Sequence, residues 1–285
     1  MFEKPLVSEE ELSDITKQLL ACGADIVEIN TIRKRLSAVK GGKFAKLCEP
    51  ANVYSIVLSD ILGDPLDMIA SGPAYPDFTT CDQALAIVEK YGLRFSPDAL
   101  GLLYQETPKA LDNVESIITG SVRSLCKAAS GICKDLGYEP VFLTDQLSCE
   151  AREAGSFLAA IAKSHQDSEK SLAFIAGGET VVHLTGKGKG GRNQEIALSA
   201  AQGIAGLKDT AVFSVGSDGT DGPTDAAGGY VDGTTQELLT KEGLDIYQVL
   251  QQNDAYPALK KSGGLIVTGA TGTNVNDVAV VLIRR

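Results

Sequence analysis

The protein has 285 residues, of which 44% are hydrophobic and 22% are charged, as in ordinary globular proteins of one or two domains. A net charge of −11 without any basic run argues against nucleic acid as a partner, and no apolar segment reaches the ~18 residues that a membrane span requires. The six cysteines show no CxxC spacing, so we expect reduced thiols in a cytoplasmic protein rather than a zinc site or a disulfide framework.

The first 42 residues predict two helices. Ser8 and Glu11 form a capping-box pattern ahead of apolar residues at helical spacing, and Gly23 is suited to end this helix. A second helical pattern extends to Gly41-Gly42, with Arg33, Lys34 and Arg35 off its apolar stripe. No glycine-rich strand–turn–helix unit of the nucleotide-binding kind precedes these helices.

Residues 53–60 read as a buried strand whose carboxyl end presents Ser59 and Asp60. Ligands of open α/β sheets bind beyond such strand ends. The glycine- and proline-rich residues 61–80 predict a long ordered loop, and loops of that length are often functional. Thr80 with Gln83 can cap the helix that follows, and a further short helix is expected after residues 96–97.

From residue 115 strands and helices alternate, which predicts a parallel sheet with right-handed crossovers. The most polar stretch, 165–171, is interpreted as a linker, so the predicted domains are 1–170 and 171–285. The predicted strands are 115–120, 139–144, 172–176, 180–184, 211–215, 264–268 and 277–283. The predicted helices are 121–137, 147–166, 192–205, 234–242 and 246–252.

Glycine is concentrated in the second half of the chain, with 15 of the 30 glycines between Gly177 and Gly243. Such density favours close approach of the backbone to a ligand, with N–H groups directed at an anion. Arg192 lies where one glycine loop meets a helix, and Asp218 and Asp221 lie in a second loop. A cation, backbone donors and clustered carboxylates suit a phosphate ester with a divalent metal. Two ordinary surface loops with solvated charges are the alternative.

Several long stretches are distinctive. In order along the chain they are EINTIRKRLSAVKGGKFA (28–45), VLSDILGDPLDMIASGPAYPDFTT (57–80), the 115–155 segment, GGETVVHLTGKGKGGRNQE (177–195), GSDGTDGPTDAAGG (216–229) and TGATGTNVNDV (268–278). Together they resemble the glycerate kinases that make 2-phosphoglycerate, a family with a MOFRL domain whose members are often named hydroxypyruvate reductases. Family members are longer at the amino end, where a GGGxS-type turn and a phosphate-facing lysine lie, so on this resemblance the chain is amino-terminally shortened. Arg35 stands where the family usually has histidine.

The resemblance implies an α/β fold: a partial Rossmann-like parallel sheet domain, 1–170, followed by a mixed α/β MOFRL-type domain, 171–285. It implies an ATP-dependent kinase that phosphorylates D-glycerate with Mg²⁺ in an interdomain cleft. Lys40, at a helix carboxyl end, could face an anionic substrate but is more often found there to complement the helix dipole. The substrate hydroxyl, the nucleotide and the oligomeric state are left open.

Site roles follow from the same resemblance. Arg192 would bind phosphate or the glycerate carboxylate, with pairing to Glu195 as the structural alternative. Asp218 and Asp221 would hold magnesium or accept the hydroxyl proton, unless they only shape their loop, and Glu179 with Asp218 would bind the metal. The residues expected to bind substrate or nucleotide are Ser59, Asp60, Ser71, Gly177, Gly178, Glu179, Thr180, Gly191, Asn193, Gln194, Gly219, Thr271, Gly272, Thr273 and Asn274, with Asn276-Asp277 in the same polar turn.

Two other functions compete with the kinase. A hydroxypyruvate dehydrogenase would need a GxGxxG unit after its first strand, and none follows the first predicted strand, 53–60. A shortened or split chain that binds a ligand or partner without turnover is the other alternative. If opening strands are missing, the exposed edge of a parallel sheet would need a companion chain or a homo-oligomer to cover it.

Overall fold

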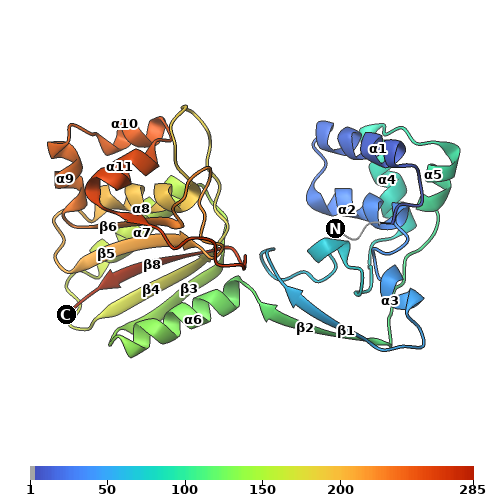
Figure 1. The fold of residues 1–285 in the computed structure, drawn as a ribbon, viewed down its shortest axis with the longest axis horizontal. Coiled ribbons are helices and arrows are strands. Elements are labelled where there is room, and N and C mark those ends of the chain that lie inside the picture. Colours follow the sequence, from blue (N-terminus) through green and yellow to red (C-terminus); the bar gives the residue numbers. More distant parts are fainter. Residues whose placement is uncertain (1–3) are drawn as a thin grey trace. The chain divides into compact units, whose positions relative to one another are not determined.

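The computed structural model describes residues 4–285, which form two compact units (Figure 1). Unit 1 comprises the chain up to Val57 together with Asp64–Thr119. Unit 2 comprises Leu58–Gly63 and Gly120–Arg285. Within residues 4–285, no helix combines the length and the apolar character that crossing a bilayer requires.

Unit 1 is a small helical assembly with a core of apolar side chains that include Ile15, Leu19 and Leu36. Its helices begin where the sequence predicted: the Ser8 side chain accepts from the N–H of Glu11, and Thr80 forms a capping box with Gln83. The elements are α1 (Glu9–Ala21), α2 (Ile26–Leu36), α3 (Lys43–Leu47), β1 (Val53–Leu58), the 3₁₀ turn η1 (Ile69–Ser71), α4 (Cys81–Tyr91), α5 (Pro97–Leu103) and β2 (Val114–Gly120), whose last residue belongs to unit 2.

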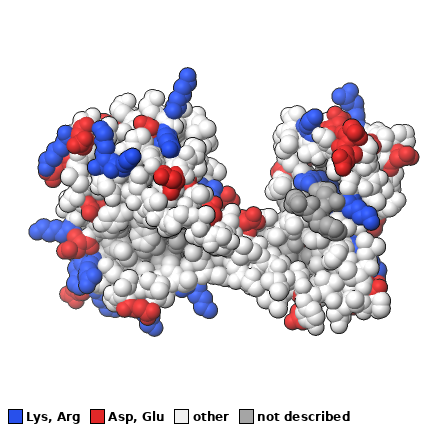
Figure 2. All heavy atoms as spheres, viewed as in Figure 1, with Lys and Arg blue, Asp and Glu red and all other residues white. Residues whose placement is uncertain are grey.

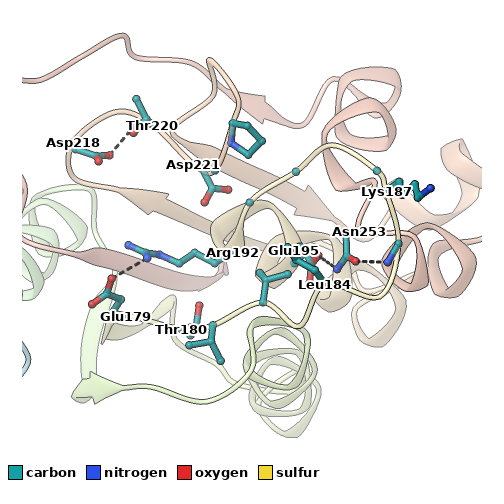
Figure 3. A pocket seen from close by; sticks show the side chains of 18 residues that line it. Glu179, Thr180, Leu184, Lys187, Arg192, Glu195, Asp218, Thr220, Asp221 and Asn253 are labelled. Atoms are coloured by element: carbon teal, nitrogen blue, oxygen red, sulfur yellow. Dashed lines mark hydrogen bonds and ion pairs between the residues drawn. The ribbon is translucent and has the colours of Figure 1, made fainter. Parts of the chain in front are cut away.

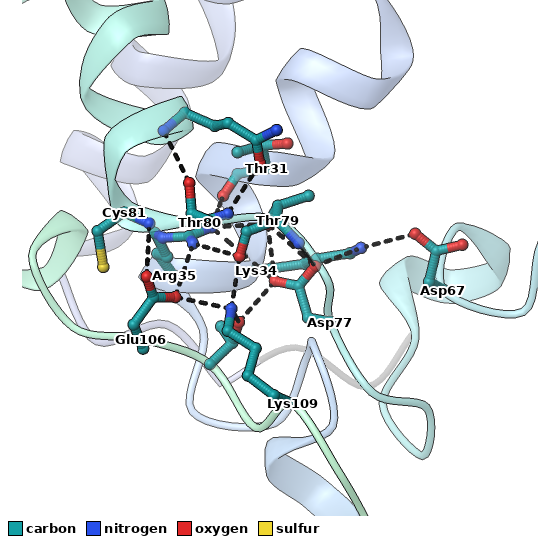
Figure 4. A network of polar contacts seen from close by, with 12 residues as sticks. Thr31, Lys34, Arg35, Asp67, Asp77, Thr79, Thr80, Cys81, Glu106 and Lys109 are labelled. Atoms are coloured by element: carbon teal, nitrogen blue, oxygen red, sulfur yellow. Dashed lines mark hydrogen bonds and ion pairs between the residues drawn. The ribbon is translucent and has the colours of Figure 1, made fainter.

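Two basic residues of α2 are buried, although they lie off its predicted apolar stripe: Lys34 and Arg35 are each 1% exposed (Figure 4). Both are paired with Asp77, which is fully buried, at 3.1 Å for Lys34 Nζ and 3.9 Å for Arg35 Nη1. Thr107 Oγ1 donates to the same carboxylate at 2.8 Å, and Glu106 lies 3.5 Å from Arg35 Nη2. Buried charges persist only when paired and hydrogen-bonded, so Asp77 organises this part of unit 1.

The strand predicted at 53–60 forms as β1, but the prediction that this strand is buried is wrong. β1 pairs only with β2, and every second side chain is exposed, with Tyr54 at 68% and Ile56 at 74%. Figure 2 shows that the visible surface over these two strands is mostly uncharged. The apolar run correctly indicated a strand, but one of its faces is not covered by residues 4–285.

Unit 2 is a six-stranded mixed sheet with the strand order β3-β4-β8-β5-β6-β7. Within this sheet β3 and β4 form the one parallel pair of neighbours, whereas β8 lies antiparallel between β4 and β5, which run in the same direction. The strands are β3 (Glu139–Leu147), β4 (Leu172–Gly178), β5 (Thr210–Gly216), β6 (Gly228–Asp232), β7 (Leu265–Ile266) and β8 (Asp277–Ile283). The helices are α6 (Val122–Asp135), α7 (Ala151–Ser164), α8 (Arg192–Gly203), α9 (Thr235–Lys241), α10 (Ile246–Gln251) and α11 (Ala255–Ser262).

Helices cover both faces of this sheet (Figure 1). α6 packs on one face against Ile175 and Val280, while α7 and α8 pack on the other against Phe174 and Val281. Successive side chains of β4 and β8 therefore point to opposite faces of the sheet and pack into two different cores, as side chains of a strand do. This arrangement confirms the predicted mixed α/β architecture, and it places the amino end of α8 beside the carboxyl ends of β4 and β5.

The domain boundary predicted near residue 170 falls inside unit 2. The strands on either side of that residue, β3 and β4, pair with each other from Glu139 opposite Leu172 to Leu147 opposite Gly178. The polar stretch 165–171 is thus the connection between α7 and β4 rather than a linker. The predicted strand at 180–184 is also absent, since Val181 makes only an isolated bridge to Glu150. The sequence missed β6 and α11, as it missed α3 of unit 1.

Candidate active site

A pocket of about 890 Å³ opens in unit 2 at the amino end of α8 (Figure 3). Its lining residues come from the loop after β4 with the first turns of α8, within 179–195, from the loop after β5, within 218–223, and from Asn253. The two glycine-rich stretches singled out in the sequence therefore face the same space.

Arg192 is the first residue of α8 and the one guanidinium among the residues that line this pocket. Its Nε donates to Asp277 Oδ2 at 2.6 Å, its Nη2 to Asp277 Oδ1 at 3.3 Å, and its Nη1 to Glu179 Oε1 at 2.9 Å. The side chain is 33% exposed. Burial lowers the pKa of Arg192, but the paired carboxylates outweigh it and raise the pKa, so the cation is permanent. The structural alternative, pairing of Arg192 with Glu195, is not found: the Glu195 carboxylate accepts a hydrogen bond from Asn253.

Asp221 lines the pocket and its carboxylate anchors the start of α8. It is 3% exposed and accepts from the backbone N–H of Asn193 at 3.1 Å and of Gln194 at 2.8 Å. Burial raises its pKa to about 6, against the effect of these two hydrogen bonds. Gly191 is required here because a Cβ at that position would collide with the Asp221 carboxylate. The anion-binding end of α8 is thus filled by a carboxylate of the protein itself.

Asp218 lines the pocket and shapes its own loop at the same time. Its Oδ1 accepts from the N–H of Thr220 at 2.9 Å, the Asx-turn arrangement that the sequence offered as the structural alternative. Gly219 follows with a φ of +86°, and a Cβ there would collide with the carbonyl of Gly269. The second oxygen of Asp218 has no hydrogen bond among residues 4–285, so this carboxylate can also meet a ligand.

Several of these glycines allow close approach between parts of the chain itself. A Cβ at Gly177 would collide with Cys126 and one at Gly178 with the backbone of Leu147, so these two glycines permit close packing of β4. Gly186 and Gly188 likewise approach the backbone around Gln252. Gly178, Gly186 and Gly188 thus lie against neighbouring backbone, and Gly177 lies against side chains of α6.

Asn253 holds the loop before α8 in place. Its Oδ1 accepts from the N–H groups of Thr185 and Gly186 at 2.8 and 2.9 Å, and its Nδ2 donates to His183 O at 3.1 Å and Glu195 Oε1 at 2.9 Å. It is 6% exposed and adopts φ +53°, which asparagine tolerates well. One amide therefore joins the loop to α8.

We expect Asn253→Asp to destabilise the protein by about 2–3 kcal/mol at neutral pH, because two donated hydrogen bonds become contacts between acceptors. The new carboxylate would lie at hydrogen-bond distance from Glu195, whose pKa is already raised by burial. A shared proton would relieve the repulsion, so stability should rise as the pH falls through the raised pKa of the pair. Urea unfolding between pH 5 and pH 8 measures this, and Glu195→Gln in the same chain should restore stability at neutral pH.

Two buried polar groups near the pocket have no partner among residues 4–285. Thr180 lines the pocket and is 4% exposed, and its Oγ1 makes no hydrogen bond. Oε1 of Gln194, in the first turn of α8, is likewise unsatisfied, whereas its Nε2 donates to Thr224 Oγ1 at 2.9 Å. Asn193 is satisfied, since its Oδ1 accepts from Ser214 Oγ. Unsatisfied buried groups are costly, and a bound molecule or water would satisfy them.

The remaining predicted binding residues do not line this pocket. Thr271 donates from Oγ1 to Ser217 O at 2.6 Å, so the exposed loop 271–274 supports the loop of Asp218 from outside. Ser71 belongs to unit 1, where it donates to Asn30 Oδ1 at 2.9 Å. The residues in question are Ser59, Asp60, Ser71, Gly177, Gly178, Asn193, Gln194, Gly219, Thr271, Gly272, Thr273 and Asn274.

The sequence motifs missed Asn253 and gave Asp277 no role beyond a polar turn, although each makes a central contact of the site. No group of three or more His, Cys, Asp or Glu side chains suited to a metal ion occurs within residues 4–285. Magnesium is usually held by one or two carboxylates together with substrate phosphates and water. Asp218 and Glu179 could supply such carboxylates, since both line the pocket.

Comparison with known proteins identifies the family. Residues 1–103 match a domain of unknown function, DUF4147, and residues 172–277 match the MOFRL family. The D-glycerate 2-kinase of Thermotoga maritima is 53% identical over 99% of this chain and 69% of its own length. The crystal structure of the glycerate kinase from that organism superposes with a TM-score of 0.96, covering 99% of this chain and 70% of the solved chain.

Two further relatives carry the two names that the sequence motifs suggested. A glycerate 2-kinase of Pyrococcus horikoshii is 41% identical over 99% of this chain and 68% of its own length. A putative hydroxypyruvate reductase of Agrobacterium vitis is 40% identical over 94% of this chain and 64% of its own length. The likeness to the kinases extends over both units and not only over the MOFRL region. The chain therefore belongs to the glycerate 2-kinase family.

Proposed function

We propose that this chain transfers the γ-phosphoryl group of ATP to D-glycerate, giving ADP and 2-phosphoglycerate, with Mg²⁺ as the required ion. The observation that carries the proposal is the guanidinium of Arg192, one third exposed in a pocket of about 890 Å³ and aligned by two carboxylates. An arginine fork of this kind matches a carboxylate or a phosphate group. Relatives named as glycerate 2-kinases over 99% of the chain support the choice of substrate.

Phosphoryl transfer depends on positioning and charge neutralisation rather than on covalent chemistry by the protein. Arg192 would neutralise one anionic group. Asp218 and Glu179 would share a magnesium ion with the phosphate oxygens, and the unpaired hydroxyl of Thr180 would donate to the ligand. Asp221 would act through its hold on the start of α8, because the backbone N–H groups of Asn193 and Gln194 occupy its carboxylate.

Purified chain of 285 residues, given ATP, Mg²⁺ and D-glycerate, is expected to release ADP and form 2-phosphoglycerate. Phosphorus NMR of the product distinguishes the 2-phosphate from the 3-phosphate. The chain spans about 69% of the Thermotoga relative, so turnover would mean that the described residues suffice for the reaction. A folded chain that binds ATP without turnover would instead support the non-catalytic alternative, and oxidation of NADH or NADPH with hydroxypyruvate would support a reductase.

We also propose that a second polypeptide, either another copy of this chain or a companion chain, covers the exposed face of β1 and β2. Two-stranded sheets are marginal alone, and Tyr54 and Ile56 present bare apolar side chains. Light scattering on the purified protein is expected to give a mass above the 29.9 kDa of one chain, and Ile56→Lys should lower it. A monodisperse single chain would contradict self-association. The six free cysteines suit a reducing, cytoplasmic setting.

A further inference from the structure

Asp277 is the first residue of β8, and its carboxylate contacts Arg192 at two atoms. Oδ2 accepts from Nε at 2.6 Å and Oδ1 accepts from Nη2 at 3.3 Å. Two roughly parallel hydrogen bonds along one edge fix the plane of a guanidinium, whereas a single contact leaves it free to rotate. Glu179 makes only such a single contact, from Oε1 to Nη1 at 2.9 Å (Figure 3).

The two carboxylates differ in rigidity. The side chain of Asp277 is 8% exposed, and its backbone lies inside the sheet, opposite Gly178 on β4 and Gly216 on β5. Both neighbours are glycines, so no side chain competes for the space above the strand ends; a Cβ on Gly216 would come within 3.4 Å of Asp277 Oδ1. The side chain of Glu179 is 47% exposed and follows the end of β4. Asp277 is therefore the fixed partner of Arg192, and Glu179 is the one that can leave.

We propose that Asp277 is a positioning residue for the kinase reaction: it holds the Nε–Nη2 edge of Arg192 and thereby offers Nη1 to the anionic group of the substrate, which replaces Glu179. The proposal rests on the proposed function only in its last step, the binding of substrate by Arg192. Its first step, that Asp277 sets the orientation of Arg192 and Glu179 does not, concerns the protein alone.

Chemical rescue tests the last step, in which Arg192 binds the substrate. Arg192→Ala should lose activity, and free guanidinium, bound along the Asp277 carboxylate, should raise the activity of this variant at least tenfold. In Arg192→Ala/Asp277→Asn this rescue should disappear. In the matched double variant Arg192→Ala/Glu179→Gln the activity without guanidinium should fall further, because Glu179 is also a proposed magnesium carboxylate, but guanidinium should still raise it at least tenfold. Asp277→Asn alone should lower kcat about 10²-fold, more than it raises KM, because the cation is misplaced rather than removed. Equal rescue in both double variants would overturn the proposal.

The NMR signal of the Arg192 Nε–H tests the first step without any turnover. In the unaltered chain this proton should exchange slowly with water, and Arg192→Lys identifies its signal. Asp277→Asn should abolish the protection and Glu179→Gln should keep it, while the amide spectrum shows that each variant is folded. If Asp277→Asn does not fold, Asp277→Ser serves for the same measurement. A protected Nε–H after loss of the Asp277 carboxylate, or an unprotected one in the unaltered chain, would refute the positioning role, whether or not the chain proves to be a kinase.

Discussion

Arg192→Lys is expected to lower kcat/KM for glycerate phosphorylation by about 10²-fold or more, although the positive charge is kept. Lysine presents a point charge on a flexible stem and cannot form the two-atom contact that Asp277 makes with Nε and Nη2. The ammonium would settle against one of the surrounding carboxylates and would lose the fixed donor that faces the pocket. Steady-state kinetics with glycerate and ATP varied separately would show which substrate loses its partner.

Arg152→Lys is the matched control for this substitution. Arg152 also contacts a carboxylate through Nε, with Glu150 Oε1 at 2.6 Å, and its side chain is 26% exposed. It does not line the pocket, so its replacement should leave kcat/KM within about twofold. Full activity of Arg192→Lys would mean that charge alone is needed and that the planar fork has no part in binding the substrate.

The sequence predicted helix starts and strands correctly where residues within a few positions of one another determine them. Capping residues such as Ser8 and Thr80 begin helices because their side chains bond to backbone a single turn away. The apolar run 53–58 correctly predicted a strand, but its burial depends on what covers each face, and no local pattern records that. Likewise, the pairing of Lys34 with Asp77 spans 43 residues and is invisible to helical periodicity.

The residues of the site also divide into those that a local pattern in the sequence marks and those that act through distant partners. Glu179, Arg192 and Asp218 were predicted because each lies within a glycine-rich stretch, and the pocket brings them together. Asn253 and Asp277 lie 58 and 85 residues from their partners and reach them only through the order of strands in the sheet. The exposed loop 271–274 was predicted from the resemblance of its polar turn to the family, and a motif does not reveal on which side of a loop a pocket lies.

Asp77→Ala is expected to destabilise unit 1 by about 3–5 kcal/mol, because it leaves two buried cations without their shared carboxylate. Lys34 and Arg35 are each 1% exposed and cannot reach water without opening α2 away from the core. Hydrogen exchange resolved by residue is the measurement, since it separates the helices of unit 1 from those of unit 2. Asp67→Ala is the control: it removes the other partner of Lys34, at 3.2 Å, but that carboxylate is 30% exposed and its loss should cost less than about 1 kcal/mol.

The pH dependence of stability gives the same prediction a second, independent readout. Burial raises the pKa of Asp77, but the hydrogen bond from Thr107 and the charge of Lys34 outweigh burial and hold the pKa below its usual value. A carboxyl group with a lowered pKa in the folded state stabilises the fold fully above its unfolded pKa of about 3.9, and that stabilisation disappears as the pH falls through the folded value. Exchange protection in α2 and α4 should therefore decrease below about pH 4 in the unaltered protein. Asp77→Ala should lose this part of the pH dependence, because no carboxylate remains to be protonated; an unchanged acid profile would mean that Asp77 is not the group that holds the two cations in the core.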